Sequence, residues 1–114
     1  MVEQLNAERL RQLQNMPDRM MAVELYTDWC PSCKSFERIF EAVAAEWSEQ
    51  GRNVTFGKLN LDEADGVAKE YGVRSVPTVL VLCGGEVLDR RTGLLGKAPL
   101  TEWLCACMEK IDRK

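Results

Sequence analysis

The pattern of apolar and polar positions along the chain predicts strands and helices in alternation. Short continuous apolar runs are typical of buried strands, and apolar residues three and four positions apart are typical of a helix with one buried face. The strand pattern fits residues 21–26, 54–61, 78–82 and 86–91. The helix pattern fits residues 6–15, 30–49, 63–71 and 99–111.

The order of these elements indicates an α/β fold. Strands that alternate with helices pair in parallel, because each helix carries the chain back across one face of the sheet. The last two strands are joined by Gly84-Gly85, a two-residue hairpin signal, so they pair antiparallel and make the sheet mixed. The 114 residues are enough for one such domain but not for two, which predicts a single domain over residues 1–114.

Composition and charge exclude several classes of partner. The chain is 46% hydrophobic and 29% charged, with a net charge of −3 and no basic cluster. We therefore expect neither nucleic acid nor a membrane surface as partner. The first 20 residues are polar and mixed in charge, without the apolar segment of a signal peptide. This favours a cytoplasmic protein, or a periplasmic one if a leader was removed.

The chain has no histidine and five cysteines. The lack of histidine excludes a Cys–His nucleophile pair, a Ser–His–Asp triad and every His-ligated metal site. The odd number of cysteines argues against a fully disulfide-bonded secreted framework. Any base that serves these cysteines must be a carboxylate, a lysine, water or another thiolate.

Two cysteines three positions apart, Cys30 and Cys33, lie where the first predicted strand ends and the long helix begins. Pro31 suits the first helical position, because its missing N–H would have no partner there. Cys30 is then at the helix N-terminus, where free N–H groups and the helix dipole favour a thiolate, the nucleophile of thiol–disulfide exchange. Cys33 lies on the same helix face, within reach of a mixed disulfide at Cys30. This setting favours a redox pair; half of a zinc site and two unrelated structural cysteines are the alternatives.

Five segments in this order resemble the thioredoxin family across nearly the whole chain. They are Trp29-Cys30-Pro31-Ser32-Cys33-Lys34, Lys58-Leu59-Asn60-Leu61-Asp62, Tyr71-Gly72-Val73-Arg74-Ser75-Val76-Pro77-Thr78, Gly84-Gly85-Glu86-Val87, and Gly93 before Lys97. The resemblance implies a thioredoxin fold, with a central mixed sheet of four to five strands and helices on both faces. It also implies a thiol–disulfide oxidoreductase that acts on protein disulfides and is recycled by a reductase. Such a protein works as a monomer, without a cofactor or metal.

The resemblance also implies where a substrate binds. Pro77 matches a cis-proline beside the active-site disulfide, and the backbone of Val76 matches the segment that pairs with an extended substrate. Trp29 and Gly93 complete the implied substrate-binding residues. An ordinary trans-proline that opens the strand 78–82 is the alternative.

The chain departs from the family's pattern at several positions. Pro31-Ser32 stand where proteins named thioredoxin usually carry Gly-Pro, Arg38 replaces the usual proline inside the long helix, and Ser75 replaces a common glycine. Pro-first pairs look more like glutaredoxins, bacterial periplasmic oxidases and cytochrome-maturation thioredoxins. One alternative function is therefore a more oxidising exchange protein of this kind. A separate alternative is a thiolate metal carrier on the same fold.

Glu24 interrupts the otherwise apolar run of residues 20–26. A carboxylate buried there lowers stability unless it is paired or protonated. The resemblance places a buried acid at this position, where it accepts the proton of the resolving cysteine, here Cys33. Lys58 matches the lysine that partners this acid. Glu24 is expected to be a general base with a raised pKa that acts through water; a solvent-facing glutamate with no role is the alternative.

The remaining cysteines are Cys83, Cys105 and Cys107. Cys83 adjoins the predicted hairpin turn and is expected to be a partly exposed, incidental thiol. On the last helix, Cys107 falls on the apolar face and Cys105 on the polar face, about 200° apart. Core packing for Cys107 and no role for Cys105 are the first interpretation. The other interpretation is a second thiol pair that relays electrons or binds metal with the first pair.

Overall fold

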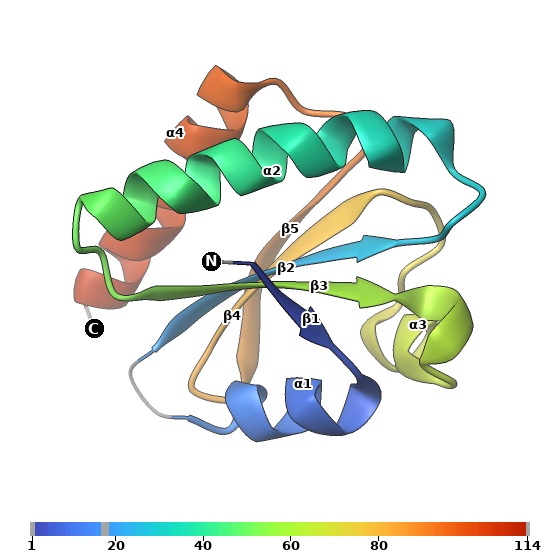
Figure 1. Cartoon of the computed structure of the whole chain (residues 1–114). Helices are drawn as coiled ribbons and strands as arrows, with labels where there is room; N and C mark the ends of the chain where they lie inside the picture. Colours follow the sequence, from blue (N-terminus) through green and yellow to red (C-terminus); the bar gives the residue numbers. More distant parts are fainter. Residues whose placement is uncertain (1, 17–18, 114) are drawn as a thin grey trace.

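A five-stranded mixed sheet forms the centre of the computed structural model, which describes residues 2–16 and 19–113 (Figure 1). The strand order is β1-β3-β2-β4-β5. The strands are β1 (Val2–Leu5), β2 (Met20–Tyr26), β3 (Val54–Asn60), β4 (Thr78–Cys83) and β5 (Glu86–Thr92). The β1–β3 and β3–β2 pairs are parallel, and the β2–β4 and β4–β5 pairs are antiparallel. The expected α/β fold with a mixed sheet is confirmed.

Helices cover both faces of the sheet. On one face lie α2 (Pro31–Glu49) and α4 (Lys97–Asp112); on the other lie α1 (Ala7–Gln14) and α3 (Val67–Tyr71) (Figure 1). A short 3-10 helix, η1 (Leu61–Glu63), precedes α3. Within residues 2–16 and 19–113, none of the helices has the length and apolar character that a membrane crossing requires.

The alternation of side chains along β2 divides the core between the two faces. Ala22 packs in the same cluster as Trp47 of α2, whereas Val23 packs on the other face with Leu10 of α1. Successive residues of a strand point to opposite faces. Glu24 therefore points toward α2, as Ala22 does.

The sequence analysis did not predict β1. Glu3 and Gln4 give this segment a polar character, and only Leu5 is buried. β1 is a short edge strand that pairs with β3 alone. Gly57 of β3 permits this close approach, because a Cβ at that position would lie 2.6 Å from Leu5 Cδ1.

The helix predicted over residues 63–71 is shorter in the structure. The chain forms η1 first, and α3 begins only at Val67. Gly66, just before α3, has a φ of 82°, in the left-handed region that a right-handed helix does not use. The apolar spacing of this segment does not reveal that interruption.

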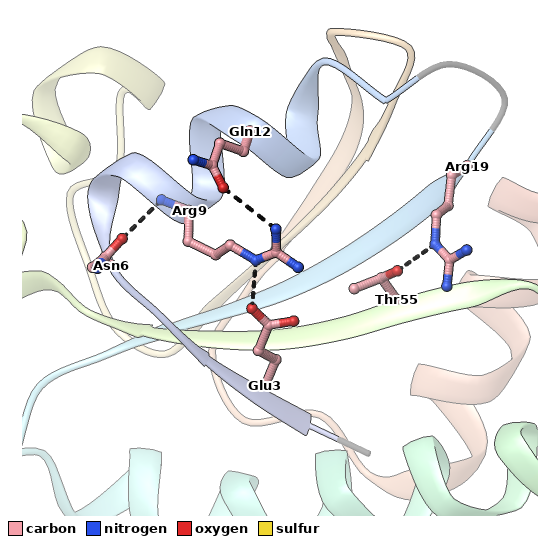
Figure 2. Close-up of polar contacts among 6 residues, drawn as sticks. All are labelled: Glu3, Asn6, Arg9, Gln12, Arg19 and Thr55. Carbon is pink, nitrogen blue, oxygen red and sulfur yellow. Dashed lines mark hydrogen bonds and ion pairs between the residues drawn. The ribbon is translucent and has the colours of Figure 1, made fainter.

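Surface polar contacts tie the β1–α1 corner together (Figure 2). Asn6 accepts a hydrogen bond from the Arg9 backbone N–H at 2.8 Å, and Arg9 Nε donates to Glu3 at 2.7 Å. Nearby, Arg19 Nε, just before β2, donates to Thr55 of β3 at 2.5 Å. This corner is held by paired polar groups at the surface.

Candidate active site

Cys30 caps the N-terminus of α2, as predicted. Its backbone is extended (φ −96°, ψ 107°), and Pro31 begins the helix. The Cys33 backbone N–H donates to Cys30 Sγ at 3.2 Å, and Ser32 Oγ lies 3.3 Å from the same sulfur. Cys30 and Cys33 are both thiols and are only 5% and 3% exposed. Ser32 is a contact of the reactive sulfur to which the sequence analysis gave no role.

The pKa values of the two thiols are shifted in opposite directions. Burial raises the pKa of Cys30, but hydrogen bonds from Cys33 and Ser32 outweigh burial and lower it below its ordinary value. Burial and the hydrogen bond with Cys30 both raise the pKa of Cys33. The arrangement therefore favours a thiolate at Cys30 beside a protonated Cys33.

The segment around Pro77 lies next to Cys30. The Val76–Pro77 peptide bond is cis, which confirms that expectation and excludes the trans alternative. The Val76 carbonyl oxygen is 3.8 Å from Cys30 Sγ, and the Pro77 carbonyl accepts a hydrogen bond from the Gly93 N–H at 2.8 Å. Gly93 has a φ of 93°, in the left-handed region that favours glycine. The fold thus brings Val76, Pro77 and Gly93 together beside the dithiol.

A groove of about 670 Å³ opens beside Cys30. Its walls include Trp29, Ser32, Asp62, Val73, Arg74 and Val76. Trp29 is 72% exposed, an unusual setting for so large an aromatic side chain. The sequence analysis did not assign Val73 and Arg74 to the site, although both stand close to Val76 in the chain. Cys33 does not line this groove, so a bound segment would meet Cys30 first.

Glu24 is fully buried behind the dithiol, with 0% exposure. Among the described residues, neither of its carboxylate oxygens has a hydrogen-bond partner, and the Thr27 hydroxyl also lacks one. A cavity of about 80 Å³ is lined by Glu24, Thr27 and Cys33, and it has room for a water molecule. Burial raises the pKa of Glu24 to about 8, and the Glu37 carboxylate adds to this rise. The alternative of a solvent-facing Glu24 is excluded.

Lys58 lies opposite Glu24 in the β2–β3 register. The sequence analysis expected it to partner Glu24, but its ion pairs are with α2 instead. Lys58 Nζ is 2.5 Å from Glu37 Oε1 and 4.0 Å from Glu41 Oε1. Glu37 is thus a charged residue of the site that the sequence analysis missed. Its position one helical turn after Cys33 was the available signal.

The other cysteines lie apart from this site. Cys107 is buried in the core, as expected. Cys105 is half-buried against the same core, and its Sγ lies 3.7 Å from Arg52 Nη1. Cys83 ends β4 and is half-buried. Over residues 2–16 and 19–113, no group of three or more cysteine, aspartate or glutamate side chains is arranged to hold a metal ion.

Comparison with known proteins identifies the family. The family described as Thioredoxin matches residues 1–106. The chain is 36% identical to the thioredoxin of Mycoplasmoides gallisepticum over 87 residues, which are 76% of this chain and 83% of the relative. It is 35% identical to the thioredoxin of Chlorobaculum thiosulfatiphilum over 80 residues, 70% of this chain and 71% of the relative.

A solved structure shows the same fold. The thioredoxin Mala s 13 of Malassezia sympodialis matches 93% of this chain and 90% of its own, with a TM-score of 0.82 at 22% identity. The expectation of a thioredoxin fold is therefore confirmed. The chain belongs to the thioredoxin family, and its Cys30–Cys33 pair stands at the active-site position of a thiol–disulfide oxidoreductase.

Proposed function

We propose that the protein reduces disulfide bonds of other proteins, with Cys30 as the nucleophile and Cys33 as the resolving thiol. The observation that carries this assignment is the hydrogen bond from the Cys33 N–H to Cys30 Sγ at the N-terminus of α2. Backbone N–H groups at a helix N-terminus stabilise an anion, so Cys30 is the thiol that ionises. Cys33, one turn inside the helix, keeps its proton until the second step.

The exchange proceeds in two steps. The Cys30 thiolate attacks one sulfur of the substrate disulfide and forms a mixed disulfide, while the other substrate sulfur leaves as a thiolate and takes up a proton. Cys33 then loses its proton and attacks Cys30 Sγ, and the second substrate sulfur leaves as a thiolate. Two electrons pass to the substrate, and the protein is left with a Cys30–Cys33 disulfide. A reductase that donates two electrons to this disulfide regenerates the dithiol.

Glu24 is the proposed acceptor of the Cys33 proton. Both side chains line the same cavity, and a water molecule in that cavity carries the proton between them. Because burial raises the pKa of Glu24 to about 8, only a minor fraction of Glu24 is ionised at neutral pH. Release of the mixed disulfide should therefore accelerate as the pH rises toward 8.

The substrate segment is proposed to lie in the groove beside Cys30. An extended chain there pairs with the Val76 backbone as a short added strand, next to the exposed ring of Trp29. Pro77 and Gly93 position this backbone through their 2.8 Å hydrogen bond. The proposed partners are thus proteins with accessible disulfides and a recycling reductase.

The proposal also includes the setting in which the protein works. We place it in the cytoplasm as a monomer. The odd number of cysteines supports a reducing compartment, and the net charge of −3 supports protein rather than nucleic-acid partners.

Two variants test the roles of the thiols, and each serves as the control for the other. With native, disulfide-bonded insulin as substrate, Cys33→Ser should accumulate a mixed disulfide, because Cys30 attacks and no second thiol resolves the product. The adduct is detected on a non-reducing gel. Cys30→Ser keeps Cys33, Cys83, Cys105 and Cys107, and it should form no such adduct. Trapping by Cys30→Ser alone would reverse the two roles.

The reduction potential tests the direction of exchange. Equilibration with glutathione buffers should give a value near about −270 mV for a reductase, whereas a value near about −120 mV would support the oxidising alternative.

A further inference from the structure

Three carboxylates, those of Glu24, Asp28 and Glu37, line the cavity behind the dithiol, and of these three only Glu24 lacks a hydrogen-bond partner among the described residues. Glu24 and Glu37 both line this cavity, together with Cys33. The Glu24 oxygens have no hydrogen-bond partner among the described residues, whereas Glu37 Oε1 is 2.5 Å from Lys58 Nζ. The ammonium that stands opposite Glu24 in the sheet register is therefore held by the Glu37 carboxylate.

The spacing of residues on α2 explains this arrangement. Cys33, Glu37 and Glu41 follow one another at intervals of four, so they lie on one face of the helix. Cys33 and Glu37 line the cavity together with Glu24. Glu37 Oε1 and Glu41 Oε1 lie 2.5 and 4.0 Å from Lys58 Nζ. Two carboxylates around one ammonium leave a net negative charge beside Glu24.

We propose that Glu37 is a positioning residue for proton transfer: it holds the Lys58 ammonium against α2, withholds this cation from Glu24, and so keeps Glu24 protonated in the resting dithiol. The inference rests on the proposed role of Glu24 as acceptor of the Cys33 proton. Glu37 touches neither the substrate nor the reacting sulfurs, and it acts through Lys58.

The charges that face Glu24 agree with this role. Burial is the largest cause of its raised pKa, and Glu37 is the next; Lys58 lowers the pKa but has the smaller effect. Glu41 and Cys30 raise it further.

Among the charges that act on the Glu24 pKa, those of Glu37 and Lys58 have the largest effects. The remaining titratable groups that line the cavity are Cys33, Tyr26, Asp28 and Lys34. From β4, the residue paired with Glu24 is the apolar Val79. The Glu37–Lys58 pair is therefore the polar contact whose disruption changes the charge at Glu24 most.

A protonated Glu24 has a consequence for the reaction. It places no second anion behind the Cys30 thiolate, so the attacking sulfur keeps its negative charge without repulsion from the interior. While Glu24 is protonated it cannot accept the Cys33 proton, so attack by Cys33 on the mixed disulfide stays slow until the pH approaches the Glu24 pKa. Glu37 thereby sets the pH range in which the resolving step becomes fast.

The first part of the test measures Glu24 directly, without turnover. The titration of Glu24 in the reduced protein can be followed by NMR of ¹³C-labelled glutamate carboxyl carbons, with Glu24→Gln to assign the signal. Glu37→Gln should lower the Glu24 midpoint by about one pKa unit or more, because an anion is removed and Lys58 is released. Lys58→Gln should raise the midpoint. Glu49→Gln removes the same charge at the far end of α2 and should leave it unchanged.

A double variant separates positioning from simple repulsion. If Glu37 acts by holding Lys58, the shift caused by Glu37→Gln should be smaller in the Lys58→Gln background than in the wild type. Equal shifts in the two backgrounds would overturn the positioning role. An unchanged Glu24 midpoint in Glu37→Gln would overturn the inference altogether.

The second part of the test connects this midpoint to the reaction. The pH midpoint for release of the mixed disulfide should fall in Glu37→Gln by the same amount as the Glu24 midpoint. If the titration midpoint of Glu24 shifts but release of the mixed disulfide keeps the wild-type pH profile, the charge coupling between Glu37 and Glu24 is confirmed. The role of Glu24 as proton acceptor, and with it the effect of Glu37 on the reaction, is then overturned.

Discussion

Helices α1 and α2 begin with the same type of cap, but the two caps have different consequences. Asn6 Oδ1 accepts the Arg9 N–H at 2.8 Å at the start of α1, and Cys30 Sγ accepts the Cys33 N–H at 3.2 Å at the start of α2. In both helices the acceptor stands three residues before the donor. A neutral asparagine is a good cap, whereas sulfur is a strong acceptor only as a thiolate. The first cap stabilises a helix, and the second stabilises an anion.

The surroundings of the two caps differ in the same sense. Around Asn6, the charged side chains of Glu3 and Arg9 are exposed and paired (Figure 2). Behind Cys30, the side-chain oxygens of Glu24 and Thr27 are buried and have no hydrogen-bond partner within the part of the chain that the structure describes. Unpaired buried polar groups lower the stability of a fold. The active site therefore retains groups that packing alone does not favour, and variants at the two caps should affect different properties.

The largest expected effect is that of Glu24→Gln on the second step of exchange. Glutamine has nearly the same shape but cannot accept a proton, so release of the mixed disulfide should slow by about 100-fold near pH 8. The difference should shrink toward pH 5, where Glu24 of the wild type is also protonated. Stopped-flow single-turnover reduction, repeated across pH, measures the difference in rate both near pH 8 and near pH 5. Superimposable profiles would mean that Glu24 takes no part in the chemistry.

The same variant should change the pH dependence of stability. The pKa of Glu24 is raised from 4.5 to about 8 on folding, so the folded state holds the proton more tightly than the unfolded state. The stabilising contribution is complete below pH 4.5 and is lost as the pH rises through 8. With about 1.4 kcal/mol for each pKa unit, this loss amounts to a few kcal/mol.

Glu24→Gln should therefore gain stability relative to the wild type between pH 5 and pH 9, as measured by urea unfolding. A constant difference across this range would contradict the raised pKa. Glu49→Gln, which removes an exposed carboxylate at the far end of α2, is the matched control.

The parts of the site that follow from local pattern could be predicted from the sequence. Pro31 after Cys30 fixes the start of α2, and a single carboxylate in an apolar run indicates a buried Glu24. The parts that depend on packing could not. β1 is a strand because Leu5 fits against Gly57, and Lys58 pairs with Glu37 because α2 crosses β3 at that point. Each of these contacts joins two segments that are far apart in the sequence, so the apolar and polar pattern of one segment alone does not predict it.

Ser32→Ala should affect the reactive cap and leave the fold unchanged. The hydroxyl lies 3.3 Å from Cys30 Sγ and helps to lower the Cys30 pKa against the opposing effect of burial. Its loss should raise that pKa by up to about one unit, because the thiolate loses one donor. Less stabilisation of the thiolate makes the dithiol more reducing, by up to about 30 mV.

Thiolate absorbance at 240 nm and glutathione equilibration measure these two shifts. Ser35→Ala, an exposed serine of the same helix, should change neither of them. If Ser32→Ala keeps the wild-type Cys30 pKa, the backbone N–H groups alone stabilise the thiolate.

Asn6→Ala should affect stability and leave the redox properties unchanged. Removal of the cap leaves N–H groups at the start of α1 without an acceptor, and the expected loss is about 1 kcal/mol in the free energy of unfolding. Asn6→Ser keeps a side-chain acceptor and should recover most of this loss. Urea unfolding and the reduction potential are measured on the same samples. A change in potential would show that the two caps are coupled, although α1 and α2 lie on opposite faces of the sheet (Figure 1).

The smallest effect is expected for Arg9→Gln at the same corner. Arg9 donates to Glu3 at 2.7 Å and to Gln12 at 3.4 Å, but the side chains of the ion pair are 45% and 40% exposed (Figure 2). Solvent and salt weaken such a pair, so the loss of stability should be smaller than that of Asn6→Ala and should disappear in high salt. Arg38→Gln, an exposed arginine on α2, controls for the change in net charge. A loss of stability that persists in high salt would mean that the Arg9 guanidinium stabilises β1 through its hydrogen bonds rather than its charge. The β1–α1 corner would then depend on hydrogen-bond geometry, as the Cys30 cap does.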